Sequence, residues 1–446
     1  MKLISSLPLD HRETIFYYPD IHVLSFDDNN EEYIKASEDF GKTLYRLFLG
    51  IRKLRILNQS DGFKRMLYIE PSRNCNLACT YCYAHAGPQF TKRLELNRIK
   101  NLVGRYNFSG VTFLGGEPLV DKAYLRSVVE MKDWDYFFFS TNGTLATESD
   151  LSYVKSRNIN FQISLEPKEW SYRVNVGGKK QYDMLKPKLH IFAKYANNLS
   201  IRVVLKDGAP YVPLRDFIDG IAEDIGSYNF TIGYWPAEGD TKLSDIFDRW
   251  VEESYAIMKS DDARKYKHKL LGHMDNIFGS DIFRFYFCNA GRESVAVGPD
   301  GQLHECHRNA IKEANSDGVS SDDDPIAVDE AKLTALLFSW LDKMNNDICS
   351  SCAARYICGG LCYLDEINNA ECSYITKLLP LALTEMNYYE HELVLKAMNK
   401  MQDTFRAFYS MRTQIERMVS NQEWDRLISG EMSVSEASIL AQRYGI

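Results

Sequence analysis

Three cysteines near the start of the chain are the residues best suited to chemistry. Cys75, Cys79 and Cys82 stand at C-x3-C-x2-C spacing, directly after an apolar run from Met66 to Ile69. A cubane iron-sulfur cluster usually takes four thiolates, so three thiolates in one short loop leave one iron without a protein ligand. The spacing therefore predicts an iron-sulfur cluster that is open to an outside ligand.

A structural zinc site is the alternative for the same loop. The three thiolates and the imidazole of His85 lie within eleven residues and form a legitimate zinc set. A second motif favours the open cluster, because Gly115, Gly116 and Glu117 follow the next apolar run, Val111 to Leu114. Glycine lets a backbone approach a ligand closely. The two motifs together predict a cluster that binds a small molecule.

With these motifs the chain resembles the radical S-adenosylmethionine (SAM) superfamily. In that superfamily the amino and carboxylate groups of SAM's methionine chelate the uncovered iron. An electron from the cluster then breaks a carbon-sulfur bond, and the resulting 5'-deoxyadenosyl radical abstracts hydrogen from the substrate. The resemblance implies that the three cysteines bind a [4Fe-4S] cluster. It also implies that Gly115, Gly116 and Glu117 receive SAM's amino group.

Six short apolar runs alternate with helix-compatible segments between about residues 66 and 240. The runs lack strict alternation, which is typical of strands buried on both faces of a parallel sheet. They predict an α/β fold, a partial (β/α)6 TIM-like barrel, and this count matches the core of the superfamily. The runs are Met66 to Ile69, Val111 to Leu114, Phe137 to Phe139, Phe161 to Leu165, Ile201 to Leu205 and Phe230 to Tyr234.

Polar residues follow the third and fourth predicted strands, where parallel α/β folds bind ligands. In the superfamily these positions commonly contact SAM's ribose or carboxylate, so we expect Asn142 and Ser164 to be cofactor contacts. We also count Tyr81, inside the cysteine motif, among these contacts. Turn chemistry is the alternative for Asn142 and Ser164. The superfamily often has Asp-Gly after the fourth strand, but Glu166 and Pro167 stand here, which leaves the role of Glu166 open.

Seven further cysteines lie beyond residue 287. Zinc fingers and ribbons pair one C-x2-C with a second C-x2-C or with two histidines, and this region has neither. The pattern resembles the SPASM domain, which binds two auxiliary four-iron clusters, so we expect three [4Fe-4S] clusters in all. The seven are Cys288, Cys306, Cys349, Cys352, Cys358, Cys362 and Cys372.

The resemblance also implies how these cysteines divide between the two auxiliary clusters. Seven thiolates cannot saturate two clusters, so the inner cluster either has an open iron or takes His304 or His307. In sulfatase-maturing relatives an Asp that acts as a base follows the equivalent of Cys306. His307 stands there instead, which argues against that subfamily and makes His307 a candidate proton acceptor. The outer cluster would take Cys349, Cys352, Cys358 and Cys372, and the inner cluster Cys288, Cys306 and Cys362.

The motifs divide the chain into five expected parts. Strands at Ile15 to Tyr18 and Val23 to Phe26, with a helix at Ala36 to Leu49, predict a small N-terminal α+β element. This element either docks a peptide leader by strand addition or caps the barrel. The parts are this element (1–62), the radical SAM core (63–240), a helical linker (241–287), the SPASM domain (288–375) and a C-terminal helical tail (376–446).

Composition narrows the class of protein. The chain has 446 residues, of which 61 are acidic and 53 basic, and it has no long Lys/Arg block. Nucleic acid is therefore not an expected partner. No run of 18 or more apolar residues occurs, and the N-terminal segment lacks the apolar core of a signal peptide. We expect no membrane association and a cytoplasmic location, where cysteines serve as metal ligands more often than as disulfides.

These features predict a radical SAM/SPASM maturase that acts on a ribosomally synthesised precursor peptide. The expected product is an oxidative intramolecular crosslink of the C-C, C-O or thioether type, and the expected second partner is an electron donor such as flavodoxin or ferredoxin. An alternative enzyme would mature a folded protein or a redox-cofactor precursor. An alternative of another class is a non-enzymatic iron-sulfur carrier or peptide-binding scaffold, although a carrier needs no SAM pocket.

Overall fold

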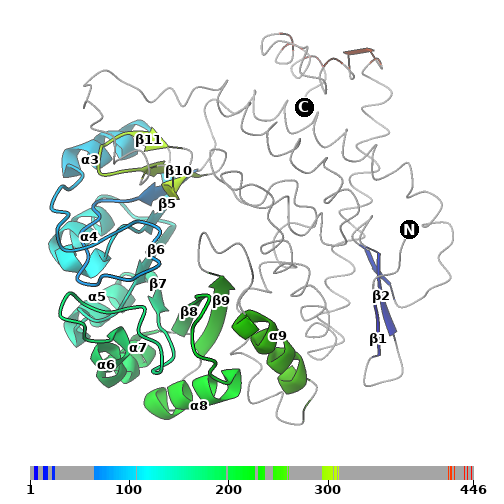
Figure 1. Cartoon of the computed structure of the whole chain (residues 1–446). Helices are drawn as coiled ribbons and strands as arrows, with labels where there is room; N and C mark the ends of the chain where they lie inside the picture. Colours follow the sequence, from blue (N-terminus) through cyan, green and yellow to red (C-terminus); the bar gives the residue numbers. More distant parts are fainter. Residues whose placement is uncertain are drawn as a thin grey trace.

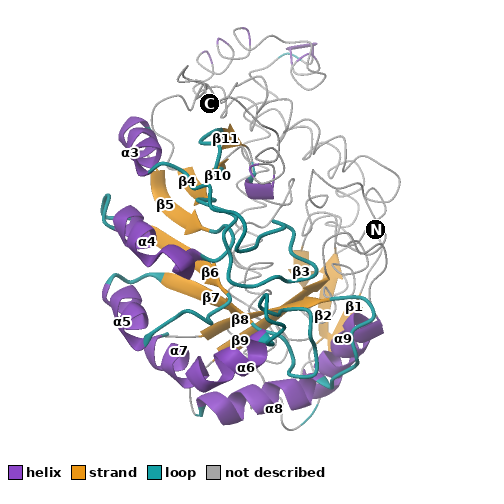
Figure 2. Ribbon diagram, turned by 60° about the vertical axis from the view of Figure 1, so that its left-hand side comes forward, coloured by secondary structure: helices purple, strands orange, loops and turns teal. Residues whose placement is uncertain are grey.

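The core of the computed structural model is a curved, mostly parallel sheet with helices along its outer side (Figure 1). Figure 2 shows the same helices along the outer side of the strands in a second view. The structure describes residues 5–8, 14–18, 23–25, 65–106, 108–196, 199–226, 230–236, 245–258, 260, 294–304, 306–308 and 310, together with 420, 422, 423, 426, 436, 439 and 443.

Six consecutive strands of this sheet pair in parallel, in the order in which they occur along the chain. Each contains or overlaps one of the apolar runs, so the predicted α/β core with six parallel strands is confirmed. The strands are β4 (Arg65–Ile69), β5 (Phe108–Phe113), β6 (Tyr136–Thr141), β7 (Asn160–Ser164), β8 (Leu199–Leu205) and β9 (Phe230–Pro236).

At least one helix follows each of the six strands, as the β/α repeat requires. Capping is clearest at α5, where Thr147 and Asp150 form a reciprocal capping box that satisfies free N–H groups of the first turn. The helices are α3 (Leu96–Arg105), η1 (Pro118–Asp121), α4 (Lys122–Val129), α5 (Glu148–Ser156), α6 (Gln181–Leu185), η2 (Lys186–Lys188), α7 (Leu189–Tyr195), α8 (Leu214–Ile225) and α9 (Asp245–Met258).

The expectation that the strands are buried on both faces is wrong for several of them. Along β8 every second residue is fully buried, and the residues between, such as Arg202, are half-buried. β7 shows the same alternation. The buried residues belong to the apolar core between sheet and helices, whereas the other face, which carries Ser200, Arg202 and Val204 of β8, is only half-buried. The inner face of the sheet is thus available for ligands.

Two strands from the expected SPASM region extend the core sheet. β10 (Ser294–Val297) pairs in parallel with β4, and β11 (Leu303–His304) pairs antiparallel with β10. The hairpin ends just before Cys306. It therefore carries one cysteine of the second set to the edge of the radical SAM core.

Two further segments bear on the expected boundaries. α9 lies in the segment expected to be a linker, but Phe247 and Trp250 are fully buried, and Trp250 stacks on Trp170 with ring centroids 6.2 Å apart. Near the N-terminus, β1 (Ser5–Pro8), β2 (Thr14–Tyr18) and β3 (Val23–Ser25) form a separate antiparallel sheet.

The helix expected at 36–49, most of the C-terminal tail and six of the seven later cysteines lie outside the described residues. Within the part of the chain that is described, no helix is long and apolar enough to cross a membrane.

Candidate functional site

The cysteine loop follows β4 at the carboxyl end of the sheet. Arg73 folds back over the loop, where its Nε donates to the carbonyl of Ala84 (2.8 Å) and its Nη2 to the carbonyl of His85 (3.1 Å). Its guanidinium also lies 4.0 Å from the centre of the Phe90 ring. Cys75 is buried, and Cys79 and Cys82 are half-buried. Arg73 thus connects the start of the loop to its end.

Each of the three sulfur atoms receives a hydrogen bond. Cys75 accepts from the backbone N–H of Leu77 (3.4 Å), Cys82 from that of Ala86 (3.4 Å), and Cys79 from Nη1 of Arg173 (3.9 Å). Such donors stabilise thiolates and tune a cluster that the thiolates hold. The arrangement fits three cluster ligands.

Burial raises the pKa of the Cys75 thiol to about 12 and that of the Cys79 thiol to about 11. Arg173 opposes the shift at Cys79. Cysteine binds metal as the thiolate, so the positive charge of a bound cluster must drive both deprotonations. The side chains of the described residues form no group of three or more His, Cys, Asp or Glu that could hold one metal ion.

Arg173 is a buried cation beside the cysteine loop, and no local sequence pattern indicates its role. Its Nε lies 3.5 Å from Oε1 of Glu166, and its guanidinium lies 5.2 Å from the centre of the Tyr81 ring. The flanking backbone also clamps the loop, because the N–H of Ala78 donates to the carbonyl of Val174 (2.7 Å). The segment after β7 therefore supplies both a charge and a brace to the cysteines.

Tyr81 and Glu166 belong to the same buried group. The hydroxyl of Tyr81 donates to Oε1 of Glu166. Burial raises the pKa of both side chains, and Arg173 opposes both shifts. Glu166, whose role the sequence left open, thus pairs with Arg173 and Tyr81 and fixes the residues around Cys79.

The glycine motif packs directly against the cysteine loop. The N–H of Gly116 donates to the carbonyl of Ser72 (2.9 Å), and that of Glu117 to the carbonyl of Asn74 (2.9 Å). A Cβ on Gly116 would lie only 2.1 Å from the Asn74 oxygen. Glycine is required here because no side chain fits between the two loops.

The carboxylate of Glu117 bonds within the protein. Oε1 accepts from the N–H of Leu119 (3.0 Å) and the hydroxyl of Thr141 (2.6 Å), and Oε2 accepts from the N–H of Asn142 (2.7 Å). Glu117 is 5% exposed, and burial raises its pKa above the ordinary value despite these donors. The carboxylate therefore ties the glycine motif to the end of β6.

Asn142 and Ser164 lie at the carboxyl ends of β6 and β7, as expected from the sequence. The side chain of Asn142 accepts from the N–H of Thr144 (3.0 Å) and donates to Oδ1 of Asn76 (3.0 Å) and to the sulfur of Cys75 (3.9 Å). Asn142 thus stabilises the turn after β6, and the same side chain also supports the cysteine loop. Ser164 is half-buried, next to Arg202 of β8 in the sheet.

The hairpin of β10 and β11 brings His307 to the same end of the sheet. Its ring stacks on Tyr68 of β4 (centroids 5.7 Å apart) and meets the edge of Tyr83, the residue after Cys82 (5.9 Å). Nδ1 of His307 lies 3.8 Å from the sulfur of Cys306. Burial, with Arg308 and Arg202 nearby, lowers the pKa of His307 to about 4. His307 is therefore neutral at pH 7.

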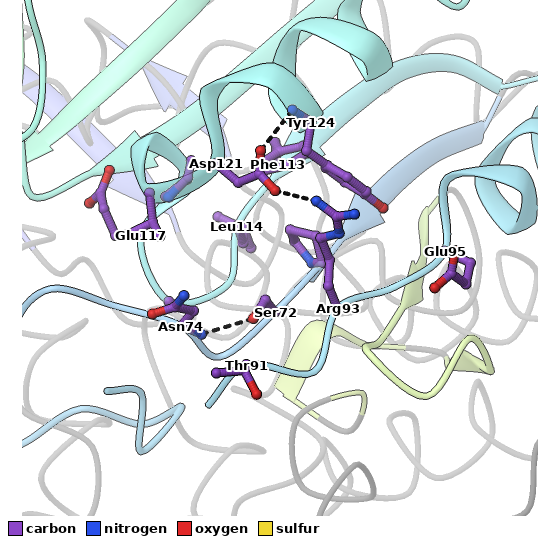
Figure 3. A pocket seen from close by; sticks show the side chains of 14 residues that line it. Ser72, Asn74, Thr91, Arg93, Glu95, Phe113, Leu114, Glu117, Asp121 and Tyr124 are labelled. Atoms are coloured by element: carbon purple, nitrogen blue, oxygen red, sulfur yellow. Dashed lines mark hydrogen bonds and ion pairs between the residues drawn. The ribbon is translucent and has the colours of Figure 1, made fainter. Parts of the chain in front are cut away.

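A pocket of about 340 Å³ opens where the two motifs meet (Figure 3). Its walls include Ser72 and Asn74 of the cysteine loop and Gly116 and Glu117 of the glycine motif. An ion pair between Arg93 and Asp121 lies at its side. The two motifs therefore border one open space at the carboxyl ends of β4 and β5.

A sequence model of the Radical SAM superfamily matches residues 69–219, from the end of β4 into α8. This stretch contains the three cysteines and the glycine motif. The chain contains a radical SAM domain. The superfamily implies a [4Fe-4S] cluster and SAM at this domain. The three hydrogen-bonded thiols fit the cluster, and the glycine motif beside them fits SAM.

Relatives and solved structures extend beyond the radical SAM domain. An uncharacterised protein of Archaeoglobus fulgidus is 25% identical over 70% of this chain and 78% of its own length. A cysteine-type anaerobic sulfatase-maturating enzyme of Clostridium perfringens is 25% identical over 42% of this chain and 60% of its own length. The solved structure of native anSMEcpe with bound AdoMet and Kp18Cys peptide superposes with a TM-score of 0.52 at 14% identity, over 75% of this chain and 99% of that chain. This chain thus shares its fold with anSMEcpe.

Proposed function

We propose that this chain is a radical SAM maturase that installs an oxidative intramolecular crosslink in a ribosomally synthesised precursor peptide. The observation that carries the proposal is the contact between the segments that follow Cys82 and Cys306. Tyr83 and His307 touch at 5.9 Å, so a residue next to the first cysteine set meets a residue next to the second. A reacting group held there would lie near both predicted clusters.

The residues have distinct roles in this proposal. Cys75, Cys79 and Cys82 hold the first cluster, Arg173 and the backbone N–H groups stabilise the thiolates, and the glycine loop borders the SAM site. When bound, the cluster and SAM supply a radical that removes hydrogen from the substrate.

Crosslinking also requires the loss of a second electron, and an auxiliary cluster at Cys306 is suited to accept it. Ser140, Gln162 and Arg202, which lie half-buried on the strands, give the inner face of the sheet a polar surface for the peptide.

The ligands of the auxiliary clusters follow from the cysteine pattern. We propose Cys349, Cys352, Cys358 and Cys372 for the outer cluster and Cys288, Cys306 and Cys362 for the inner one. His304 is 7% exposed, and its Nε2 already pairs with Oδ2 of Asp300 (3.2 Å). This pairing favours an open iron over His304 as the fourth ligand of the inner cluster.

Maturation of a folded protein is the second candidate function. The similarity to a sulfatase-maturating enzyme favours it, whereas His307 in place of an Asp argues against that subfamily. An electron donor such as flavodoxin or ferredoxin is part of both proposals, since radical formation consumes an electron.

The mass of the product distinguishes these functions. The protein should be expressed anaerobically with the peptides encoded by short reading frames beside its gene. We expect one peptide to become about two mass units lighter per crosslink, through loss of two hydrogens. A gain of about fourteen mass units would indicate methylation instead. Unchanged peptides, with turnover on a folded protein, would favour the second function.

A further inference from the structure

Gln181 is the first residue of α6, and its side chain is buried where β6 and β7 end. Its Nε2 donates to the carbonyl of Asn142 (2.7 Å) and also to the carbonyl of Ser164. Asn142 directly follows β6, and Ser164 is the last residue of β7. One side-chain amide therefore connects the carboxyl ends of two neighbouring strands.

The orientation of this amide is fixed by its two partners. Both are carbonyl oxygens, which accept hydrogen bonds and cannot donate them. A flipped amide would place Oε1 against two oxygens, so only Nε2 can occupy this position. Oε1 itself has no hydrogen-bond partner among the described residues, and a buried acceptor without a donor is destabilising. Gln181 thus joins the strand ends at some cost in stability.

Gln181 also closes the hairpin that carries Arg173. Its backbone N–H donates to the carbonyl of Arg173 (2.8 Å). Inside the hairpin, Val174 and Lys180 form an antiparallel bridge. The base of the hairpin is therefore tied, through the side chain of Gln181, to the ends of β6 and β7.

Two of the residues that Gln181 holds by their backbone carry a side-chain donor to a cysteine. Nδ2 of Asn142 lies 3.9 Å from the sulfur of Cys75, and Nη1 of Arg173 lies 3.9 Å from the sulfur of Cys79. Donors to the sulfur atoms stabilise the reduced form of a cluster more than the oxidised form, because the reduced form carries one more negative charge. The direction of both donors depends on the backbone that Gln181 fixes.

We propose that Gln181 is a positioning residue for the first cluster. It directs the side-chain donors of Asn142 and Arg173 at their sulfur atoms and thereby raises the reduction potential of the cluster. This inference rests on the proposed function only in requiring that the three cysteines of the first set hold a cluster. Radical formation consumes an electron from that cluster, so a higher potential allows a weaker reductant to start the reaction.

A redox titration of the anaerobically reconstituted protein, followed by electron paramagnetic resonance, tests the proposal. The signal of the first cluster is the one that changes when SAM is added. Gln181→Met fills a similar space but donates to neither carbonyl. It should make reduction of this cluster about tenfold less favourable, a fall of about 59 mV in midpoint potential for one electron. Gln181→Glu, kept protonated by burial, donates one hydrogen bond and should show a smaller fall. Gln89→Met, at an exposed position of the cysteine loop, is the matched control and should keep the potential of the wild type.

A double substitution separates positioning from general damage to the fold. Asn142→Ala already removes one of the two donors, so adding Gln181→Met to it should lower the potential by less than Gln181→Met does alone. Equal falls in both backgrounds, or an unchanged potential in Gln181→Met, would overturn the inference. If Gln181→Met does not retain its iron, the same comparison is made with Gln181→Glu. Absence of a SAM-sensitive iron-sulfur signal in the wild type would overturn the proposed function as well.

Discussion

Replacing Cys82 with alanine is expected to abolish the formation of 5'-deoxyadenosine from SAM. Cys82 is one of three thiols in a loop that offers no fourth, and its sulfur accepts the N–H of Ala86 in a preformed position. Losing one thiolate leaves a second iron without a protein ligand, and such a cluster is unstable. We expect the yield of 5'-deoxyadenosine to fall about a hundredfold or more. The variant should hold about four fewer irons per chain than the wild type, which should hold about twelve.

Cys358→Ala is the matched control for this experiment. Cys358 is assigned to the outer auxiliary cluster, so its loss should lower the iron content by a similar amount and stop product formation. Some 5'-deoxyadenosine should still form, because the first cluster is intact. Cleavage of SAM by Cys82→Ala at the native rate would show that the initiating cluster is held elsewhere.

Gly116→Ala is expected to have the second large effect. An added methyl group would lie 2.1 Å from the carbonyl oxygen and 2.6 Å from the carbonyl carbon of Asn74. Both atoms belong to the backbone of the cysteine loop, which cannot rotate away as a side chain would. The two motifs must therefore separate, at a cost of about 1–3 kcal/mol. We expect weaker SAM binding and a loss of 5'-deoxyadenosine formation of about two orders of magnitude, measured on anaerobically reconstituted protein.

Gly104 offers a control with the same glycine-to-alanine substitution. It lies in α3, and a Cβ there would meet nothing within 4 Å. Gly104→Ala should therefore leave SAM cleavage unchanged and stabilise the protein by about 0.4–1 kcal/mol, since alanine loses less conformational entropy on folding. Normal SAM affinity and turnover in Gly116→Ala would contradict the packing of the two motifs described above.

The strands and the two motifs could be predicted because their signals are local. Each apolar run gave one strand of the parallel sheet, and a ligand loop after β4 or β5 has to lie at the carboxyl end. The inner face was not predicted, since polar residues such as Arg202 alternate with apolar ones in β8 and the runs were interpreted as uniformly buried. Hydrophobic content alone does not show which face a sheet leaves open.

The contacts around the cysteines depend on residues far apart in the sequence. Arg173 reaches Cys79 through a long loop after β7, and Cys306 reaches the site because β10 pairs with β4. Neither pairing leaves a local pattern.

The radical formed at this site is expected to remove hydrogen from a peptide, and isotope transfer provides a direct test. The peptide that loses about two mass units should be prepared fully deuterated at carbon and incubated with the protein, SAM and reductant. We expect the 5'-deoxyadenosine to be heavier by about one mass unit and to accumulate at the same rate as the crosslinked peptide. Formation of unlabelled 5'-deoxyadenosine beside an unchanged peptide would contradict it.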